Sequence, residues 1–221
     1  MLMEKAVVFD MDGVIFDTEP LVMKVWEELG KIHHFDHVKK VCYECLGTNR
    51  ETSKRIFLKH YGEDFPYDEY AKESSVIYHE RYDGNVPLKP GVHELLTYLK
   101  DNQYRLALAS STRAYTVKLQ LKNAGLIDYF EAIITGYMVT ASKPDPMIYL
   151  KACEAIHVKP EETYAIEDSY NGIRSAYNAR MRSIMVPDLK APDGEMEEKS
   201  TVILKDLYEV MDYLKKEDQN I

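Results

Sequence analysis

Hydrophobic and polar residues follow two patterns along the chain, and together they predict strands that alternate with helices. Short, continuous apolar runs, several of them rich in β-branched residues, are typical of strands buried on both faces. Six runs fit this description: 6–9, 106–109, 132–135, 164–166, 183–186 and 201–204. Apolar residues at helical spacing lie at 92–99, 115–124, 146–156 and 171–179. This alternation predicts an α/β fold, with a Rossmann-like, doubly wound parallel sheet and right-handed crossovers.

The region from residue 17 to residue 85 breaks the alternation, because it contains no convincing buried strand. Its apolar spacing instead predicts helices over 21–29, 51–60 and 67–82, the first beginning near Thr18-Glu19-Pro20 and ending at Gly30. The turn-rich segment Asp83-Gly84-Asn85-Val86-Pro87 would lead the chain back. We therefore expect a core domain of residues 1–16 and 86–221, with an inserted helical cap domain at 17–85.

Composition narrows the possible partners and location. The 221 residues carry a formal net charge of −9, which argues against nucleic acid or an anionic membrane as a partner. Three cysteines do not make a disulfide scaffold. No apolar run approaches the roughly 18 residues that span a bilayer, and the first residues lack a signal-peptide pattern. The sequence thus indicates a cytoplasmic protein, by default a monomer.

Polar residues follow four of the predicted strands where each strand ends. Because the carboxyl ends of parallel strands meet at one edge of the sheet, these side chains should converge. The converging residues are Asp10 and Asp12, then Ser110, Ser111 and Thr112, then Lys143, and finally Glu167 and Asp168.

Four carboxylates at one edge would repel one another unless a cation lies among them. Carboxylate oxygens without His or Cys in the motifs favour Mg²⁺, which also takes substrate phosphate oxygens as ligands. With Lys143 and the hydroxyl groups, the site would suit a phosphoryl group. Asp10 could attack phosphorus, and Asp12, on the same side two residues later, could serve as acid and base.

The sequence resembles the haloacid dehalogenase-like hydrolase superfamily, in its branch of small phosphatases and β-phosphoglucomutase-like enzymes. Four segments carry the resemblance in order: Phe9-Asp10-Met11-Asp12-Gly13-Val14, Ala109-Ser110-Ser111-Thr112, Ser142-Lys143-Pro144 and Ile166-Glu167-Asp168-Ser169. The match covers nearly the whole chain. It implies a mobile cap that closes over the substrate.

The resemblance also implies a role for each motif residue. Asp10 would be the nucleophile and Asp12 the general acid and base. Ser110, Ser111 and Lys143 would bind the phosphoryl group. Mg²⁺ would be held by the Asp10 carboxylate, the Asp12 backbone carbonyl and Asp168, with Glu167 beside it. Thr18, Gly47 and Arg50 would contribute substrate specificity from the cap.

Within this superfamily the second aspartate favours phosphate esters, whose leaving group needs a proton, over halides. Phosphoglucomutase-like members carry a His and a Lys in the cap where this chain has Val22 and Leu46. The second phosphate of a sugar bisphosphate would then have fewer charged side chains to bind. We therefore predict a Mg²⁺-dependent phosphatase for a small phosphorylated metabolite such as a sugar phosphate. The alternatives are a sugar-phosphate mutase and, more remotely, a non-enzymatic signalling domain that accepts a phosphoryl group on Asp.

Several other features call for simpler interpretations. Cys42 and Cys45, with His33, His34 and His37 upstream, invite a zinc site, but their spacing favours helix packing. Arg180 stands where the family usually has Gly after a helix, which predicts a small stability cost. Residues 195–199 are expected to form a solvated face or loop, and the charged tail 215–221 is expected to fray.

Overall fold

The computed structural model describes residues 5–48 and 50–219, and its central feature is a six-stranded parallel sheet. The order is β3-β2-β1-β4-β5-β6, so the first strand lies in the middle and the chain winds outward on both sides. The strands are β1 Ala6–Phe9, β2 Arg105–Ser110, β3 Ala132–Thr135, β4 Thr163–Glu167, β5 Arg182–Met185 and β6 Val202–Ile203. The predicted doubly wound α/β fold is confirmed.

Helices cover both faces of this sheet, and the residues of β1 show why. Val7 and Phe9 lie in the apolar cluster on one face, whereas Ala6 and Val8 lie in the cluster on the other, because side chains alternate along a strand. Helices α5 (Val92–Asp101), α6 (Ala114–Asn123) and α10 (Leu207–Gln219) pack into the first cluster, and α7 (Met147–Ala155) and α8 (Tyr170–Asn178) into the second.

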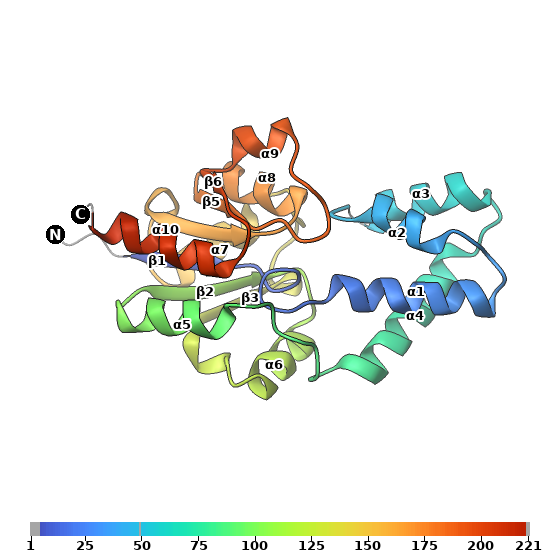
Figure 1. Ribbon diagram of the computed structural model, residues 1–221, viewed down its shortest axis with the longest axis horizontal. Coiled ribbons are helices and arrows are strands. Elements are labelled where there is room, and N and C mark those ends of the chain that lie inside the picture. Colours follow the sequence, from blue (N-terminus) through green and yellow to red (C-terminus); the bar gives the residue numbers. More distant parts are fainter. Residues whose placement is uncertain (1–4, 49, 220–221) are drawn as a thin grey trace.

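Four helices between β1 and α5 form a separate block at one end of the molecule (Figure 1). Trp26, Phe57 and Tyr67 pack together in their own apolar cluster, with ring centroids 4.6 and 5.9 Å from Trp26. The helices are α1 Glu19–Ile32, α2 Val38–Cys45, α3 Arg50–Tyr61 and α4 Tyr67–Tyr82. The block therefore has an apolar core of its own.

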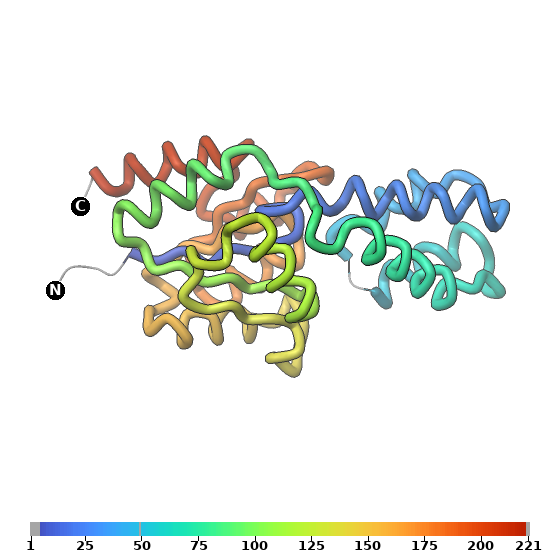
Figure 2. Tube along the Cα trace, turned by 90° about the horizontal axis from the view of Figure 1, so that it is seen from below, coloured from blue at the N-terminus to red at the C-terminus, as the bar shows by residue number. Residues whose placement is uncertain are grey.

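The two chain segments that join the blocks lie side by side (Figure 2). The backbone N–H of Asp17 donates to the carbonyl of Pro87 at 2.8 Å, and that of Lys89 donates to Ile15 at 2.8 Å. Lys89 also pairs with Asp17 at 3.3 Å and with Asp188 at 2.7 Å. The helical block is therefore attached through one short, paired connection.

The sequence prediction was wrong about the end of the first helix. Gly30 lies inside α1, which continues to Ile32. A Cβ at Gly30 would lie 2.5 Å from Val38 Cγ2 and 2.8 Å from the carbonyl oxygen of Phe35. The glycine therefore permits a close approach of the next segment rather than ending the helix. No bounds were predicted for α2, although the spacing of Cys42 and Cys45 favoured helix packing; the residue before this helix, His37, has a φ of +63° and provides no side-chain cap.

Two segments near the C-terminus belong to helices. Residues 195–199 lie in α9 (Gly194–Lys199), whose N-terminal amides are capped by Asp193; Glu197 and Glu198 are exposed, as expected of a solvated face, whereas Met196 is fully buried. Residues 215–219 belong to α10, because Asp218 pairs with Lys5 at 2.6 Å and accepts hydrogen bonds from Tyr98 and Tyr104 at 2.7 and 2.8 Å. Residues 220–221 lie outside the described part.

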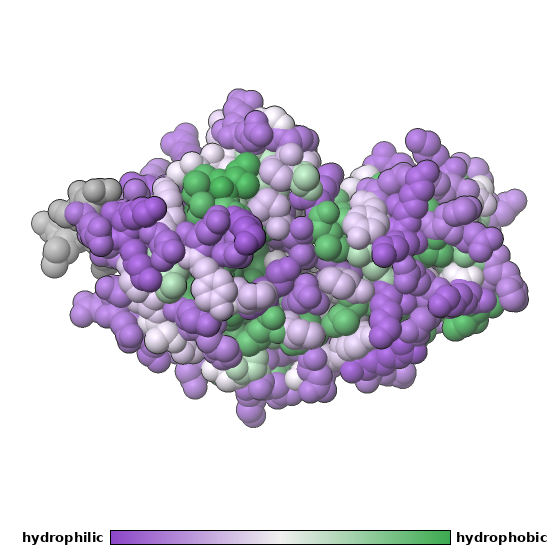
Figure 3. Space-filling view, viewed as in Figure 1, coloured by the Kyte–Doolittle hydropathy of each residue, from purple (hydrophilic) through white to green (hydrophobic). Residues whose placement is uncertain are grey.

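Hydrophilic side chains dominate the face shown in Figure 3, and the apolar patches there are scattered. None of the helices in the described ranges combines the length and apolar character needed to cross a bilayer.

Candidate active site

Three adjacent strands deliver polar side chains to one edge of the sheet. Asp10 directly follows β1, Ser110 ends β2 and Glu167 ends β4. Phe9 pairs with Leu108 and Ile166 in the parallel register, which brings these three ends to the same level. Asp10 is 7% exposed, and Ser110 and Glu167 are fully buried. The convergence expected from the sequence is therefore present.

Lys143 connects two of these strand ends. Its Nζ donates to Asp10 Oδ1 at 2.5 Å, to Glu167 Oε1 at 2.6 Å and to the Ala109 carbonyl at 3.1 Å. Burial opposes the charged amine, but the two carboxylates outweigh it and raise the pKa of Lys143 above its usual range. A protonated lysine is thus fixed beside Asp10.

Glu167 is held by hydrogen bonds on both carboxylate oxygens. Besides Lys143, Oε1 accepts from Tyr149 Oη at 2.8 Å. Oε2 accepts from the amides of Asp168 and Ser169 at 3.1 Å each and from Ser169 Oγ at 3.0 Å. A Cβ at Gly172 would overlap this carboxyl group, so only glycine leaves room for it. Glu167 therefore holds both Lys143 and the loop after β4 in position through hydrogen bonds.

Asp12 faces the second motif. Its Oδ2 accepts a hydrogen bond from Thr112 Oγ1 at 2.7 Å, and the Thr112 amide donates to Ser110 Oγ at 3.0 Å. Burial raises the pKa of Asp12, although hydrogen bonds from hydroxyl groups and the charge of Lys143 oppose this rise. Thr112, which the sequence marked only as one hydroxyl of the motif, is the direct partner of Asp12.

Three carboxylates form a cluster at the ends of β1 and β4. Oxygens of Asp10, Glu167 and Asp168 lie within 4.8 Å of one another. Burial raises the pKa of Asp10 to about 8; Lys143 opposes the rise, whereas Glu167 and Asp12 add to it. Burial, then Glu167 and Asp10, also raises the pKa of Asp168. The cluster carries more negative charge than one lysine can balance.

The donor set fits a hard divalent cation. All three side chains offer oxygen, the donor that Mg²⁺ prefers, and a cation would relieve their repulsion. Next to Asp168, a cavity of about 20 Å³ is also lined by Glu19 and Asp188. Asp188 Oδ2 is buried there without a hydrogen-bond partner among the described residues. The cavity is large enough for one water molecule.

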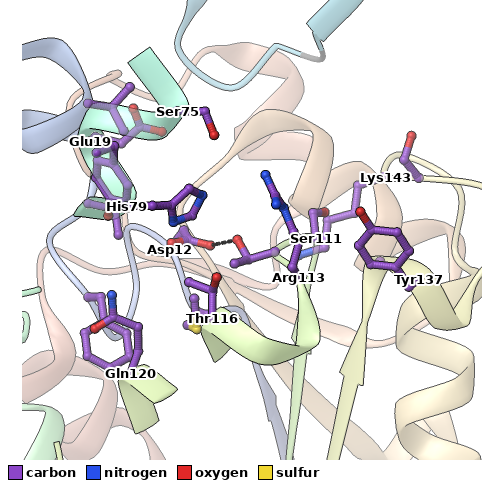
Figure 4. Close-up of a pocket in the computed structure, with 18 of the residues that line it drawn as sticks. Asp12, Glu19, Ser75, His79, Ser111, Arg113, Thr116, Gln120, Tyr137 and Lys143 are labelled. Atoms are coloured by element: carbon purple, nitrogen blue, oxygen red, sulfur yellow. Dashed lines mark hydrogen bonds between the residues drawn. The ribbon is translucent and has the colours of Figure 1, made fainter. Parts of the chain in front are cut away.

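A cleft of about 860 Å³ separates the core from the helical block (Figure 4). Asp12, Ser111 and Lys143 line it from the core, and Thr18 lines it at the start of the helical block. Among the other predicted site residues, Asp10, Ser110, Glu167 and Asp168 do not line this cleft. Sequence reasoning did not identify a further set of polar lining residues, because they lie outside the motifs: Glu19, Ser75, His79, Arg113, Thr116 and Tyr137.

The predicted cap residues divide into two groups. Gly47 lies against the core, where a Cβ would be 3.6 Å from the Tyr170 amide, and it lines the small cavity beside Asp168. Arg50 instead pairs with Asp68 at 3.0 Å, and its side chain is 72% exposed. The structure does not bring Arg50 to the cleft. Asn49, which precedes Arg50 in the chain, lies outside the described residues.

The cysteine and histidine segment packs inside the helical block. Cys42 belongs to the apolar cluster of that block, and Cys45 packs against it. Burial raises the pKa of Cys42 to about 12 and of Cys45 to about 11, which favours neutral thiols over metal-binding thiolates. His33 Nε2 donates to Glu73 Oε2 at 2.8 Å. This geometry favours a packing role.

A parallel sheet with paired aspartates and a buried lysine at its carboxyl edge, next to a helical block across a cleft, defines a class of capped α/β hydrolases. The family model of haloacid dehalogenase-like hydrolases matches residues 7–186. The chain is 29% identical to a phosphorylated carbohydrates phosphatase of Thermotoga maritima, over 96% of this chain and 98% of the relative. It is 30% identical to a β-phosphoglucomutase of Bacillus subtilis, over 82% and 83%.

Solved structures agree with these matches. A crystal structure of CbbY from Rhodobacter sphaeroides in complex with phosphate aligns with a TM-score of 0.72 at 25% identity, covering 95% of this chain and 96% of that one. The chain belongs to the haloacid dehalogenase-like hydrolase family, in its phosphatase and β-phosphoglucomutase branch. The predicted family and enzyme class, a phosphoric monoester hydrolase, are confirmed.

Proposed function

We propose that the protein is a Mg²⁺-dependent phosphatase that hydrolyses a small phosphorylated metabolite, such as a sugar phosphate, through an aspartyl phosphate on Asp10. The observation that carries the proposal is the position of Asp10, between a protonated Lys143 and the carboxylate cluster with Asp168. The Thermotoga maritima relative, named for phosphorylated carbohydrates, supports the substrate class.

In the first half of the reaction, an Asp10 oxygen attacks phosphorus and the bond from phosphorus to the leaving oxygen breaks. Asp12 gives that oxygen its proton. Burial raises the pKa of Asp12, which favours the protonated form that this step requires. The hydrogen bond from Thr112 fixes the orientation of the Asp12 carboxyl group.

In the second half, Asp12 takes a proton from a water molecule that attacks the aspartyl phosphate. The bond between phosphorus and Asp10 breaks, which releases phosphate and restores the free carboxylate. The same residue thus acts first as an acid and then as a base, because its protonation state reverses between the two halves.

Lys143, Ser110 and Ser111 bind the phosphoryl group in this proposal. Lys143 supplies the positive charge that phosphoryl oxygens need, and Glu167 positions it. Ser111 lines the cleft directly, whereas the buried Ser110 holds the loop through the Thr112 amide. The serine hydroxyl groups would donate hydrogen bonds, and Lys143 would form an ion pair, to the phosphoryl oxygens that remain bound to phosphorus.

Asp10, Asp168 and the backbone carbonyl of Asp12 would hold the Mg²⁺, whose charge would neutralise the phosphoryl oxygens when it is bound. Glu167 was also predicted at the metal. Its oxygens already accept hydrogen bonds from Lys143, Tyr149 and the loop after β4, so we assign it a positioning role beside the ion.

The helical block at 17–85 would act as the cap. Thr18 and Gly47 lie close enough to the core to contribute to specificity, whereas Arg50 would first have to leave Asp68. All proposed catalytic groups come from one chain, so a monomer suffices.

The sugar-phosphate mutase is less well supported. Val22 lines the cleft and Leu46 is 7% exposed, so apolar side chains occupy both positions where the mutases carry a His and a Lys. The signalling alternative does not account for a cleft of about 860 Å³ next to Asp12.

The test is hydrolysis of p-nitrophenyl phosphate with Mg²⁺ or with EDTA, for wild type, Asp10→Asn and Asp12→Ala. Asp212→Asn is the matched control, because the side chain of Asp212 is 65% exposed and its ion-pair partner is Lys215 on the same helix. We expect metal-dependent turnover that both site variants lose and the control retains. Turnover that survives in Asp10→Asn would overturn the mechanism. Without wild-type turnover, sugar phosphates with a bisphosphate primer would test the mutase.

A further inference from the structure

Helix α4 presents polar side chains to the cleft beside apolar and aromatic ones such as Ala71 and Tyr78. Ser75 and His79 are four residues apart and share a face, and both line the cleft. Glu19 joins them from the start of α1. Figure 4 shows these three side chains on the cap side of the cavity and Asp12 below them. The proposed phosphoryl chemistry uses none of the three.

His79 is held in a fixed orientation. Its Nδ1 lies 2.8 Å from Asp83 Oδ1, one helical turn further on, and both side chains are largely buried, at 29% and 21% exposed. The carboxylate accepts from Nδ1–H, which leaves Nε2 for a ligand in the cleft. In a neutral ring Nε2 is an acceptor, so it can bind a hydroxyl group that donates.

Glu19 gives the same wall a second acceptor. It is partly buried and lines both the cleft and the small cavity beside Asp168. Acceptors on this wall suit a ligand rich in hydroxyl donors. The positive side chains of the cleft, Arg113 and Lys143, come from the core. The positive core wall therefore favours the phosphoryl group of a substrate, and the cap wall with its acceptors favours the hydroxyl groups of the leaving group.

We propose that His79, oriented by Asp83, and Glu19 are specificity-determining residues that recognise hydroxyl groups on the leaving group, so that esters whose leaving group carries several hydroxyl groups are preferred to esters without them. This inference rests on the proposed function, because the phosphoryl group must occupy the core side for the leaving group to face α4. An ester without hydroxyl groups would leave both acceptors unpaired in the cleft, which lowers its affinity.

The test compares cyclohexyl phosphate, which has no hydroxyl groups, with glucose 6-phosphate, ribose 5-phosphate and sorbitol 6-phosphate. For wild type we expect the best hydroxylated ester to exceed cyclohexyl phosphate at least about tenfold in kcat/KM. In His79→Ala this ratio should fall about tenfold, chiefly through KM. His79→Gln, which keeps a polar atom near Nε2, should restore part of it, and Asp83→Ala should give an intermediate loss.

His60→Ala is the matched control, because His60 makes the same kind of pair with Glu44 at 2.8 Å but does not line the cleft. It should leave the ratio unchanged. A ratio that stays within about twofold of wild type in His79→Ala, equal losses for all esters, or a wild-type preference for cyclohexyl phosphate would each overturn the inference. Failure of the proposed function is separate: it would appear as turnover that survives in Asp10→Asn.

Discussion

Replacing Gly172 by Ala should damage the site through Glu167, although residue 172 contributes no reacting group. The added Cβ would overlap Glu167 Cδ and both of its oxygens. Glu167 is fully buried and holds Lys143 at 2.6 Å, so the carboxylate must move and this ion pair must lengthen or break. Loss of one partner from a buried pair costs about 3–5 kcal/mol, and the better helix propensity of Ala returns about 1 kcal/mol. We expect a net loss of about 2–4 kcal/mol in the free energy of unfolding.

Urea unfolding measures this loss, and hydrolysis of p-nitrophenyl phosphate measures its effect on Lys143. Because Lys143 also binds Asp10, kcat/KM should fall about tenfold to hundredfold. Gly194→Ala is the matched control, since nothing lies within 4 Å of a Cβ there, and it should be neutral or slightly stabilising. If Gly172→Ala stayed within about 0.5 kcal/mol of wild type with normal turnover, Glu167 could not position Lys143 as we argue.

Three further predictions follow from the same structure. Mg²⁺ at 100 times its Kd should add about 2.7 kcal/mol to the free energy of unfolding, seen as a rise in Tm of about 5–10 °C that Asp168→Asn largely removes. Arg180→Gly should raise Tm by about 2–4 °C because Arg180 has a φ of +62°, and Arg180→Ala, which keeps the strain, should not. Hydrogen bonds from Lys5, Tyr98 and Tyr104 outweigh burial and lower the pKa of Asp218, so this carboxylate stabilises the fold above the unfolded pKa of about 3.9. In urea unfolding at pH 7, the free energy of unfolding of Asp218→Asn should be lower than that of wild type. The two values should converge as the pH falls through the lowered pKa of Asp218 in the folded protein. A difference that stays constant with pH would contradict this.

The sheet could be predicted from the sequence because its strands are encoded locally. All six apolar runs became strands of one parallel sheet, since a strand covered on both faces needs a continuous apolar segment. Gly30 and Asp218 were misjudged because their roles depend on distant partners. The glycine makes room for Val38, and the aspartate holds a charged tail to Tyr98 and Tyr104. Neither contact leaves a local pattern.

The core side of the site was also predictable, because each motif lies next to the strand that positions it. Asp10, Ser110 and Glu167 needed only strand ends and a parallel register to converge. The position of Lys143 followed from its motif, whereas its simultaneous contact with Asp10 and Glu167 required the tertiary structure. The resemblance to the family assigned the roles that geometry alone left open.

The cap side was not predictable, and the physical reason bears on function. Helix α4 buries only Tyr67 and Ser74 fully, so its sequence lacks the continuous apolar stripe that marks a packing helix. Polar residues such as Ser75 and His79 stand among the apolar and aromatic residues with which α4 lines the cleft. A helix that gives up apolar packing at such positions loses stability, so the interruption needs another explanation. Hydroxyl recognition on the leaving group provides one, and it assigns the catalytic chemistry to the core and the choice of substrate to α4.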